Sequence, residues 1–152
     1  MSRAERTADR IYARPPHFAL HYRAGRRLRW SAGPRADYAA LLLLGGQMRW
    51  QSSTEDSSEA ASGEVSPGGA LLAAPGDWLT ASSGASAELL IVTLAPLFVL
   101  DCAARARLTR SDSVVTFRAP SVERDERLAR LARDLAEELL EESAGQELVV
   151  SA

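Results

Sequence analysis

The chain has little of what most metal-dependent and membrane-crossing proteins rely on. Its 152 residues include one cysteine and two histidines, and all eighteen basic residues are arginine. A single cysteine excludes a framework of internal disulfides and is typical of a reducing compartment, so we predict a cytoplasmic protein. No apolar run approaches the ~20 residues that a membrane-spanning helix needs, and MSRAERTADR lacks the apolar stretch of a secretory signal. We therefore expect no membrane partner.

The scarcity of histidine restricts the possible metal chemistry. His17 and His21 are four residues apart, which on a helix would suggest a pair of metal ligands. On the strand predicted here, four residues span ~13 Å, which is too far for one ion. Cys102 lies in an apolar helical stretch without a catalytic base, and we expect it to be a packed small side chain. We find no catalytic constellation and predict no enzyme activity, bound metal or cofactor.

Charge is nearly balanced overall, at −2, but it is unevenly distributed. Residues 1–49 hold ten arginines against three acids, whereas 134–147 hold acids and no base. The arginines between 23 and 35 follow a strand pattern that has no series of aromatic residues for base stacking. A solvated strand face therefore explains them better than a nucleic-acid-binding patch.

Alternation of apolar and polar residues predicts a series of strands. FALHYR (18–23) and RRLRW (26–30) alternate on either side of an Ala-Gly turn, and the near-continuous apolar runs DYAALLLL and AELLIVTL are typical of strands buried on both faces. Further short strands are predicted at 47–51, 70–74 and 78–82. The segment SSTEDSSEAASG (52–63) has no apolar periodicity, so we expect a mobile loop there. The polar residues 1–16 are expected to be a flexible arm.

The apolar period changes from two to 3.6 after residue 94. Pro96 is suited to the first position of a helix at about 96–108, and Ser121 is the predicted N-cap of a helix at 122–142. QELVVSA (146–152) looks like a further helix that the end of the chain interrupts. Strands first and helices last predict a mainly β fold, with a barrel at 17–95 and a helical segment at 96–152.

Several stretches, taken in order, resemble one known domain. HYRAG and ADYAALLLLGG resemble its opening strands, and EVSPGGALLAAPGDW is similar to the second half of a cupin barrel. AELLIVTLAPLFV resembles the junction between the last barrel strand and a helix opened by proline. FRAPSVERDERLARLARDLAEELLEE resembles the helix after the barrel, including Asp125, Arg127 and Leu128. The domain that these stretches resemble is the N-terminal domain of the AraC family of bacterial transcription regulators.

This resemblance implies a cupin-type double-stranded β-helix barrel, or jelly roll, followed by C-terminal α-helices. It implies a small-molecule effector bound inside the barrel and helices that pair two subunits as a homodimer. The helix-turn-helix domain through which the family binds DNA is absent from this chain, so we expect no specific DNA binding by the chain alone. Metal-binding cupins carry a histidine after the proline turn, but here Trp78, Leu79 and Thr80 follow Pro75. The family's metal chemistry is therefore not carried over.

Two sets of residues are candidates for function. Aromatic and polar side chains on or beside the predicted strands suit a pocket, because an indole offers a flat apolar face and one N–H donor. The ligand-binding candidates are His21, Tyr22, Trp30, Tyr38, Arg49, Trp50 and Trp78. Arg49 and Trp50 are adjacent on a strand, so at most one of them points inward. The dimerisation candidates are Leu128, Leu131, Leu135 and Leu139, which form one helical stripe, together with Leu148 and Val149.

Two other interpretations fit the same sequence. The chain could be a free-standing small cupin, either an enzyme or a binding protein, although the missing histidines count against the enzyme. It could also be a pure dimerisation module whose barrel is filled by its own side chains. The many Leu, Val and Ala residues at 38–44 and 87–94 make a filled barrel credible.

Overall fold

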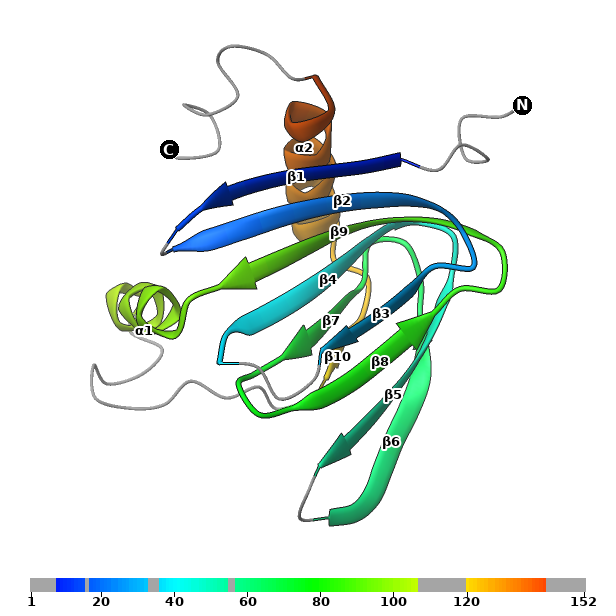
Figure 1. The fold of residues 1–152 in the computed structure, drawn as a ribbon, viewed down its shortest axis with the longest axis horizontal. Coiled ribbons are helices and arrows are strands. Elements are labelled where there is room, and N and C mark those ends of the chain that lie inside the picture. Colours follow the sequence, from blue (N-terminus) through cyan, green and yellow to red (C-terminus); the bar gives the residue numbers. More distant parts are fainter. Residues whose placement is uncertain (1–7, 16, 33–35, 55–56, 107–119, 142–152) are drawn as a thin grey trace.

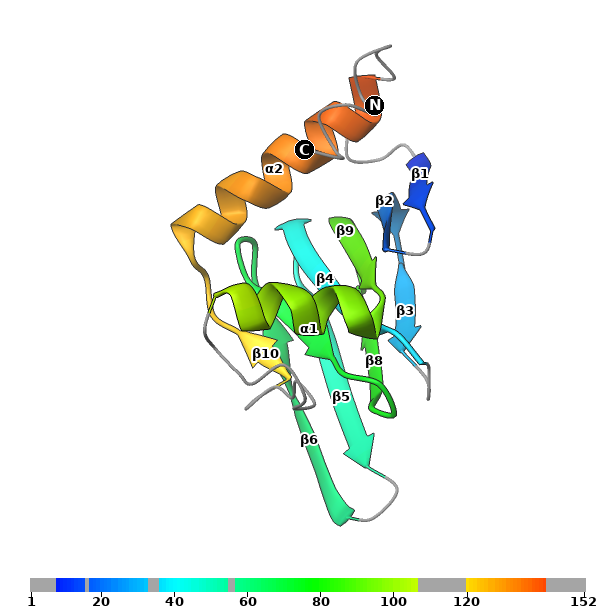
Figure 2. The ribbon, with the colours of Figure 1, turned by 90° about the vertical axis from the view of Figure 1, so that its left-hand side faces the viewer.

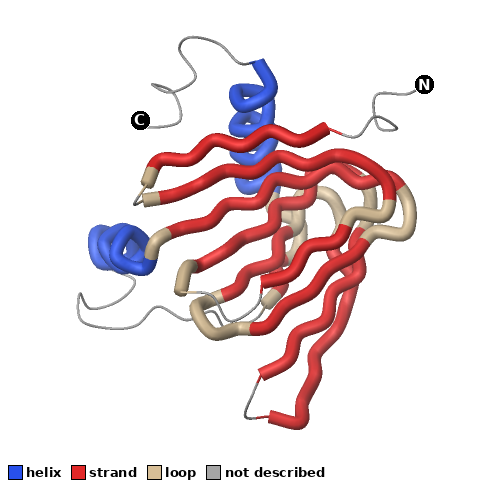
Figure 3. Tube along the Cα trace, viewed as in Figure 1, coloured by secondary structure: helices blue, strands red, loops and turns tan. Residues whose placement is uncertain are grey.

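The described residues form two facing antiparallel β-sheets with helices attached. The structure is a computed structural model, and it describes residues 8–15, 17–32, 36–54, 57–106 and 120–141. Strands account for most of the described residues (Figure 3). The strands are β1 (Ala8–Arg14), β2 (Phe18–Arg26), β3 (Arg29–Ala32), β4 (Tyr38–Gly45), β5 (Met48–Thr54), β6 (Ser57–Val65), β7 (Ala70–Ala73), β8 (Trp78–Ser82), β9 (Ser86–Leu94) and β10 (Ser121–Val122). The helices are α1 (Pro96–Arg105) and α2 (Glu126–Glu141).

The strand order defines a jelly roll (Figure 1). Sheet A has six strands in the order β1-β2-β9-β4-β7-β10, and sheet B has four in the order β3-β8-β5-β6. The eight strands from β2 to β9 thus interleave as two Greek keys, which is the arrangement of double-sheet jelly rolls. β1 and β10 extend sheet A at its two edges. The prediction of a mainly β, cupin-type double-stranded β-helix followed by a helix is confirmed.

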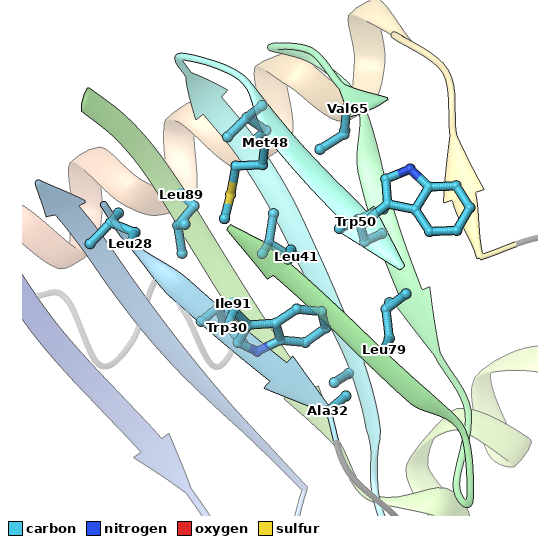
Figure 4. Packing of buried hydrophobic residues seen from close by; sticks show 14 of the residues in the cluster. Leu28, Trp30, Ala32, Leu41, Met48, Trp50, Val65, Leu79, Leu89 and Ile91 are labelled. Atoms are coloured by element: carbon cyan, nitrogen blue, oxygen red, sulfur yellow. The ribbon is translucent and has the colours of Figure 1, made fainter. Parts of the chain in front are cut away.

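A first apolar cluster fills the space between the two sheets (Figure 4). Leu41 and Leu43 of β4 point into it and are at most 1% exposed, whereas the alternate residues Leu42 and Leu44 point to the other face of sheet A. Both faces of β4 are therefore buried, as its continuous apolar run predicted. The cluster comprises Leu28, Trp30, Ala32, Ala39, Leu41, Leu43, Met48, Trp50, Val65, Leu71, Ala73, Leu79, Ala81, Ala87, Leu89 and Ile91.

A second apolar cluster lies on the outer face of sheet A, under α2 (Figure 2). Ala132, Ala136 and Leu139 are buried there against strands β2, β4, β7 and β9. The helix begins after Asp125, whose Oδ1 accepts hydrogen bonds from the backbone N–H groups of Arg127 (2.9 Å) and Leu128 (3.0 Å). The predicted N-cap at Ser121 is therefore wrong, because Ser121 pairs with β7 as part of β10.

Two segments predicted to lack structure are strands. Residues 8–14 of the expected flexible arm form β1, paired along its whole length with β2. Most of the expected loop at 52–63 belongs to the hairpin of β5 and β6. β1 and β6 each lie at a sheet edge, where ladder hydrogen bonds can form without much side-chain burial, so neither needs the apolar periodicity on which the sequence prediction depended. The predicted division into a barrel at 17–95 and a helical segment at 96–152 is modified accordingly, since β1 and β10 join sheet A.

Helix α1 follows β9 directly and begins at Pro96, as predicted. Its described contacts include Phe98, whose ring centroid lies 5.7 Å from that of His17 and 6.3 Å from that of Phe18. Leu97 is 81% exposed, and Cys102 is exposed rather than packed as we predicted, because Ala103 is the residue that α1 buries. Neither described helix combines the length and apolar character needed to cross a membrane.

Candidate functional site

The three tryptophans do not converge on one pocket. Trp30 and Trp50 flank Ala81 in register on three adjacent strands of sheet B, and both indoles point between the sheets (Figure 4). They are 8% and 7% exposed, respectively. Trp78 lies on β8 with the opposite orientation and is 40% exposed on the outer face of sheet B. A ligand inside the barrel could reach Trp30 and Trp50 but not Trp78.

Trp50 contains the one buried side-chain polar atom in the described part of the chain that has no hydrogen-bond partner, its indole Nε1. Gly63 faces it in register on β6, and a Cβ at that position would lie 3.0 Å from the indole. Because Gly63 has no side chain, the Trp50 indole can occupy the space that a larger residue would fill. An unsatisfied buried donor is costly, so an acceptor at this position would stabilise the fold.

The other ligand-binding candidates lie outside the barrel interior or at its margin. Tyr22 is buried in the second cluster, where its hydroxyl donates to Glu88. His21 pairs with Asp9 of β1, which ties the added edge strand to β2. Tyr38 is 4% exposed at the start of β4, and Arg49 points outward with its Nε 3.4 Å from Glu64 Oε1. As predicted, only one of Arg49 and Trp50 faces inward.

A polar network that the sequence analysis did not identify joins α2 to sheet A. Arg133 donates to Glu88 Oε1 at 2.9 Å and to the backbone oxygen of Leu44 at 3.1 Å, while Tyr22 donates to the other carboxylate oxygen of Glu88. Glu88 thus bridges a strand residue and a helix residue. The position of Glu88 along β9 fixes the face of the sheet on which its side chain lies. No local sequence pattern indicated that Arg133 would be its partner.

The dimerisation candidates occupy different environments. Leu139 is buried and Leu128 and Leu135 are half-buried, all three packed in the second cluster against sheet A. Leu131 is 54% exposed. Leu148 and Val149 lie outside the described residues. The stripe therefore serves mainly the chain's own fold, and Leu131 is its exposed member.

The described residues do not fit a metal centre of the kind found in metal-dependent cupins. No group of three or more His, Cys, Asp or Glu side chains in the described ranges is placed to hold an ion. After the Pro75 turn, the first residue of β8 that points into the barrel is Leu79, which like Ala81 belongs to the first apolar cluster. Thiolate, imidazole and carboxylate ligands are needed for transition metals, and Leu79 supplies none.

Comparison with solved structures finds cupin domains of low sequence similarity. The cupin domain of Schizosaccharomyces pombe Cnp3 is 12% identical, with a TM-score of 0.48 and coverage of 66% of this chain and 69% of that chain. A cupin superfamily protein from Desulfitobacterium hafniense is 12% identical, with a TM-score of 0.47 and coverage of 62% and 83%. A point mutant of Bacillus subtilis oxalate decarboxylase is 10% identical, with a TM-score of 0.48 and coverage of 80% and 38%. No protein-family model and no curated protein matches the chain.

Proposed function

We propose that this chain is the non-catalytic dimerisation domain of a transcription regulator of the AraC type. In this proposal the filled barrel is a scaffold that holds α2, two α2 helices pair the subunits, and DNA is bound by a separate helix-turn-helix domain. The resemblance of the barrel and the following helix to that family supports the regulator assignment. The observation that carries the pairing function is the surface around Leu131, which is self-complementary in charge.

The Leu131 surface combines apolar and charged residues one turn to either side. Helix neighbours lie three and four positions apart, so Leu131 is surrounded by Arg127, Leu128, Asp134 and Leu135. The two flanking leucines are half-buried, and the two charged residues are exposed. Arg127 lies about 6 Å before Leu131 along the helix axis and Asp134 about 4.5 Å after it.

Two copies of this surface match when the helices run antiparallel. Arg127 and Asp134 are seven residues apart, nearly two full turns, and therefore lie on the same side of the helix. A two-fold axis beside Leu131 then brings Arg127 of one copy next to Asp134 of the other, twice. The two Leu131 side chains meet at the centre, where each would bury its exposed half. Such an isologous contact closes as a C2 dimer.

Replacing Leu131 with glutamate should weaken the dimer by at least about tenfold in Kd, because the change removes apolar burial and places like charges on the axis. Sedimentation velocity over a concentration series measures this effect. Leu97→Glu is the matched control, since Leu97 is 81% exposed on α1, away from the proposed contact. Equal weakening by both variants, or a monomeric parent chain, contradicts the proposal.

A charge exchange tests the antiparallel arrangement itself. Arg127→Glu and Asp134→Arg should each weaken the dimer about threefold to tenfold, since each replaces two attractive pairs with two repulsive ones. The double variant restores unlike charges at both positions and should recover most of the parent affinity. Additive loss in the double variant would place the interface elsewhere on the molecule.

The orphan donor of Trp50 favours a second candidate function, binding of a small effector inside the barrel. A ligand with a hydrogen-bond acceptor could satisfy Nε1, which lies buried next to Gly63. Trp50→Phe removes the donor and keeps an aromatic ring. If an effector uses this donor, a melting-temperature rise found in a metabolite screen should fall in Trp50→Phe and persist in Trp78→Phe. Equal rises in both variants would exclude Trp50 as the effector's donor.

A further inference from the structure

Four turns meet at one end of the jelly roll, towards the right of Figure 1. The residues of these turns line an open depression. The turns β2–β3, β4–β5, β6–β7 and β8–β9 each contribute to its lining, and its volume is about 920 Å³. Small-molecule pockets have volumes of roughly 300–1,000 Å³. None of its lining residues belongs to the Leu131 surface, and Met48 is the one lining residue that it shares with the first apolar cluster.

Two arginines of the depression are positioned by the tryptophans beside them. The dipeptide Arg-Trp occurs on β3 as Arg29-Trp30 and on β5 as Arg49-Trp50. Because side chains alternate along a strand, burial of each indole between the sheets directs each guanidinium to the outer face. Both arginines pair in register with Ser82 of β8, which lies on the strand between them.

The spacing lets the two guanidinium groups act together. Neighbouring strands are about 4.8 Å apart, so the backbones at Arg29 and Arg49 are separated by about 10 Å across the central strand. An extended arginine side chain covers more than half of that distance, which allows both groups to reach one ligand above Ser82. The Ser82 hydroxyl adds a donor and acceptor at the midpoint.

A third arginine reaches the depression from a strained turn. Arg27 has a φ of 52°, and it is the one non-glycine residue with positive φ in the described part of the chain. An ordinary L residue avoids this region, and such residues persist where the surrounding structure holds them. Here the β2–β3 turn places Arg27 among the residues that line the depression.

Charge in the depression is strongly positive although the chain's net charge is −2. Three arginines line it with one carboxylate, that of Glu64, which lies 3.4 Å from Arg49 in an exposed pair. Arg27 and Arg29 form no ion pair with an acidic residue of the described ranges. Three guanidinium groups in one hollow repel one another, and an anion between them relieves that repulsion.

The surface next to the depression indicates which chemical groups the rest of the ligand would carry. A second hollow of about 510 Å³ shares Arg29, Arg49 and Ser82 and continues along the outer face of sheet B past Gln51 and Thr80. These neutral side chains donate and accept hydrogen bonds, as hydroxyl groups of a ligand would require. Trp30 and Trp50 point between the sheets, and Trp78, two residues from Thr80 on β8, is the one exposed tryptophan on this outer face, so the face has no series of aromatic rings on which successive nucleic-acid bases could stack.

We infer that this depression is a binding site for a small organic phosphate, with the phosphate held by Arg27, Arg29 and Arg49 and a hydroxylated part extending past Gln51 and Thr80. This inference goes beyond the proposed pairing function and does not depend on it. Guanidinium groups match a phosphate through two parallel N–H donors, which favours arginine over lysine at such a site.

The site is tested with glucose 6-phosphate, inorganic phosphate and glucose as probes, by calorimetric titration of the full chain at constant ionic strength. We expect saturable binding of glucose 6-phosphate in the millimolar range or tighter, weaker binding of inorganic phosphate, and none of glucose. Arg29→Gln and Arg49→Gln should each weaken binding about threefold to tenfold, since each removes one charge-assisted contact at an exposed position. Both residues are exposed, so the variants should keep the parent's circular dichroism.

Arg130→Gln is the matched control, because Arg130 is an exposed arginine on α2 that lines neither the depression nor the adjoining hollow. Equal loss in this control would show that binding reflects general charge and would overturn the inference. So would failure of glucose 6-phosphate to saturate below about 10 mM, a concentration that corresponds to under 3 kcal/mol of binding free energy. Salt-sensitive binding of duplex DNA that requires Arg29 and Arg49, without phosphate binding, would replace it with a nucleic-acid surface.

Discussion

Replacing Leu41 with alanine is expected to lower the free energy of unfolding by about 2–5 kcal/mol, the largest effect of any single truncation considered. Leu41 is 0% exposed in the middle of β4, within the cluster between the two sheets. Its removal loses the transfer free energy of the side chain and leaves a cavity that strands on both sides hold open. Urea unfolding followed by circular dichroism, at one fixed protein concentration, measures the loss.

The matched control for this truncation is Leu97→Ala. Leu97 is the same residue type but is 81% exposed on α1, so its truncation should change the free energy of unfolding by no more than about 0.5 kcal/mol. The contrast also tests whether the barrel is filled. If Leu41→Ala cost as little as the control, the space between the sheets would be loosely occupied and could hold a ligand instead.

Local sequence patterns were sufficient to predict the strands that are buried on both faces. The alternation of Leu41 and Leu43 with Leu42 and Leu44 required two apolar surroundings, and β4 has them in the barrel interior and under α2. The same logic assigned Arg49 and Trp50 to opposite faces. Which face each took follows from burial cost, because an unpaired guanidinium in an apolar interior is far more costly than an exposed indole.

Local sequence patterns could not predict which strands pair with one another across the chain. β1 forms because β2 offers a free edge, and its own sequence shows little alternation beyond a half-buried Tyr12 and an exposed Ile11. The strand order likewise decides whether an apolar residue of sheet A faces the barrel or the helix. Tyr22 was expected to line a pocket inside the barrel, yet it packs under α2 and borders a hollow of about 360 Å³ between α2 and sheet A, since its side of β2 is the outer face of the sheet.

The outward orientation of Trp78 could have been predicted from the alternation of residues along β8. In WLTAS the apolar residues Leu79 and Ala81 take the inner face of β8, so alternation alone places Trp78 outside. The arginine-lined depression is different, because its residues come from four separated turns and strands. Only the repeated Arg-Trp dipeptide hinted at two equivalent positions, and their approach across Ser82 depends on the register of three strands.

The turn between β4 and β5 controls the geometry of that depression, and it should be intolerant of any side chain. Gly46 has a φ of +81°, and a Cβ on it would lie 2.4 Å from the backbone oxygen of Ser86 and 2.9 Å from the Cα of Ala87. Gly46→Ala therefore combines left-handed strain with a clash against backbone that cannot rotate away. We expect a loss of about 3–5 kcal/mol in the free energy of unfolding.

Gly76→Ala separates the cost of left-handed backbone strain from the cost of the steric clash. Gly76 has a similar φ of +89°, but nothing lies within 4 Å of its Cβ position. Its replacement should cost only the left-handed strain of about 1–2 kcal/mol, partly offset by the lower conformational entropy that alanine gives the unfolded chain. Thermal and urea unfolding of both variants measure the difference directly. If the two losses were equal, the close approach of the β4–β5 turn to the start of β9 would be wrong. The β4–β5 and β8–β9 turns would then not meet at the depression. The arginines that line it would not be held close to one another by these turns.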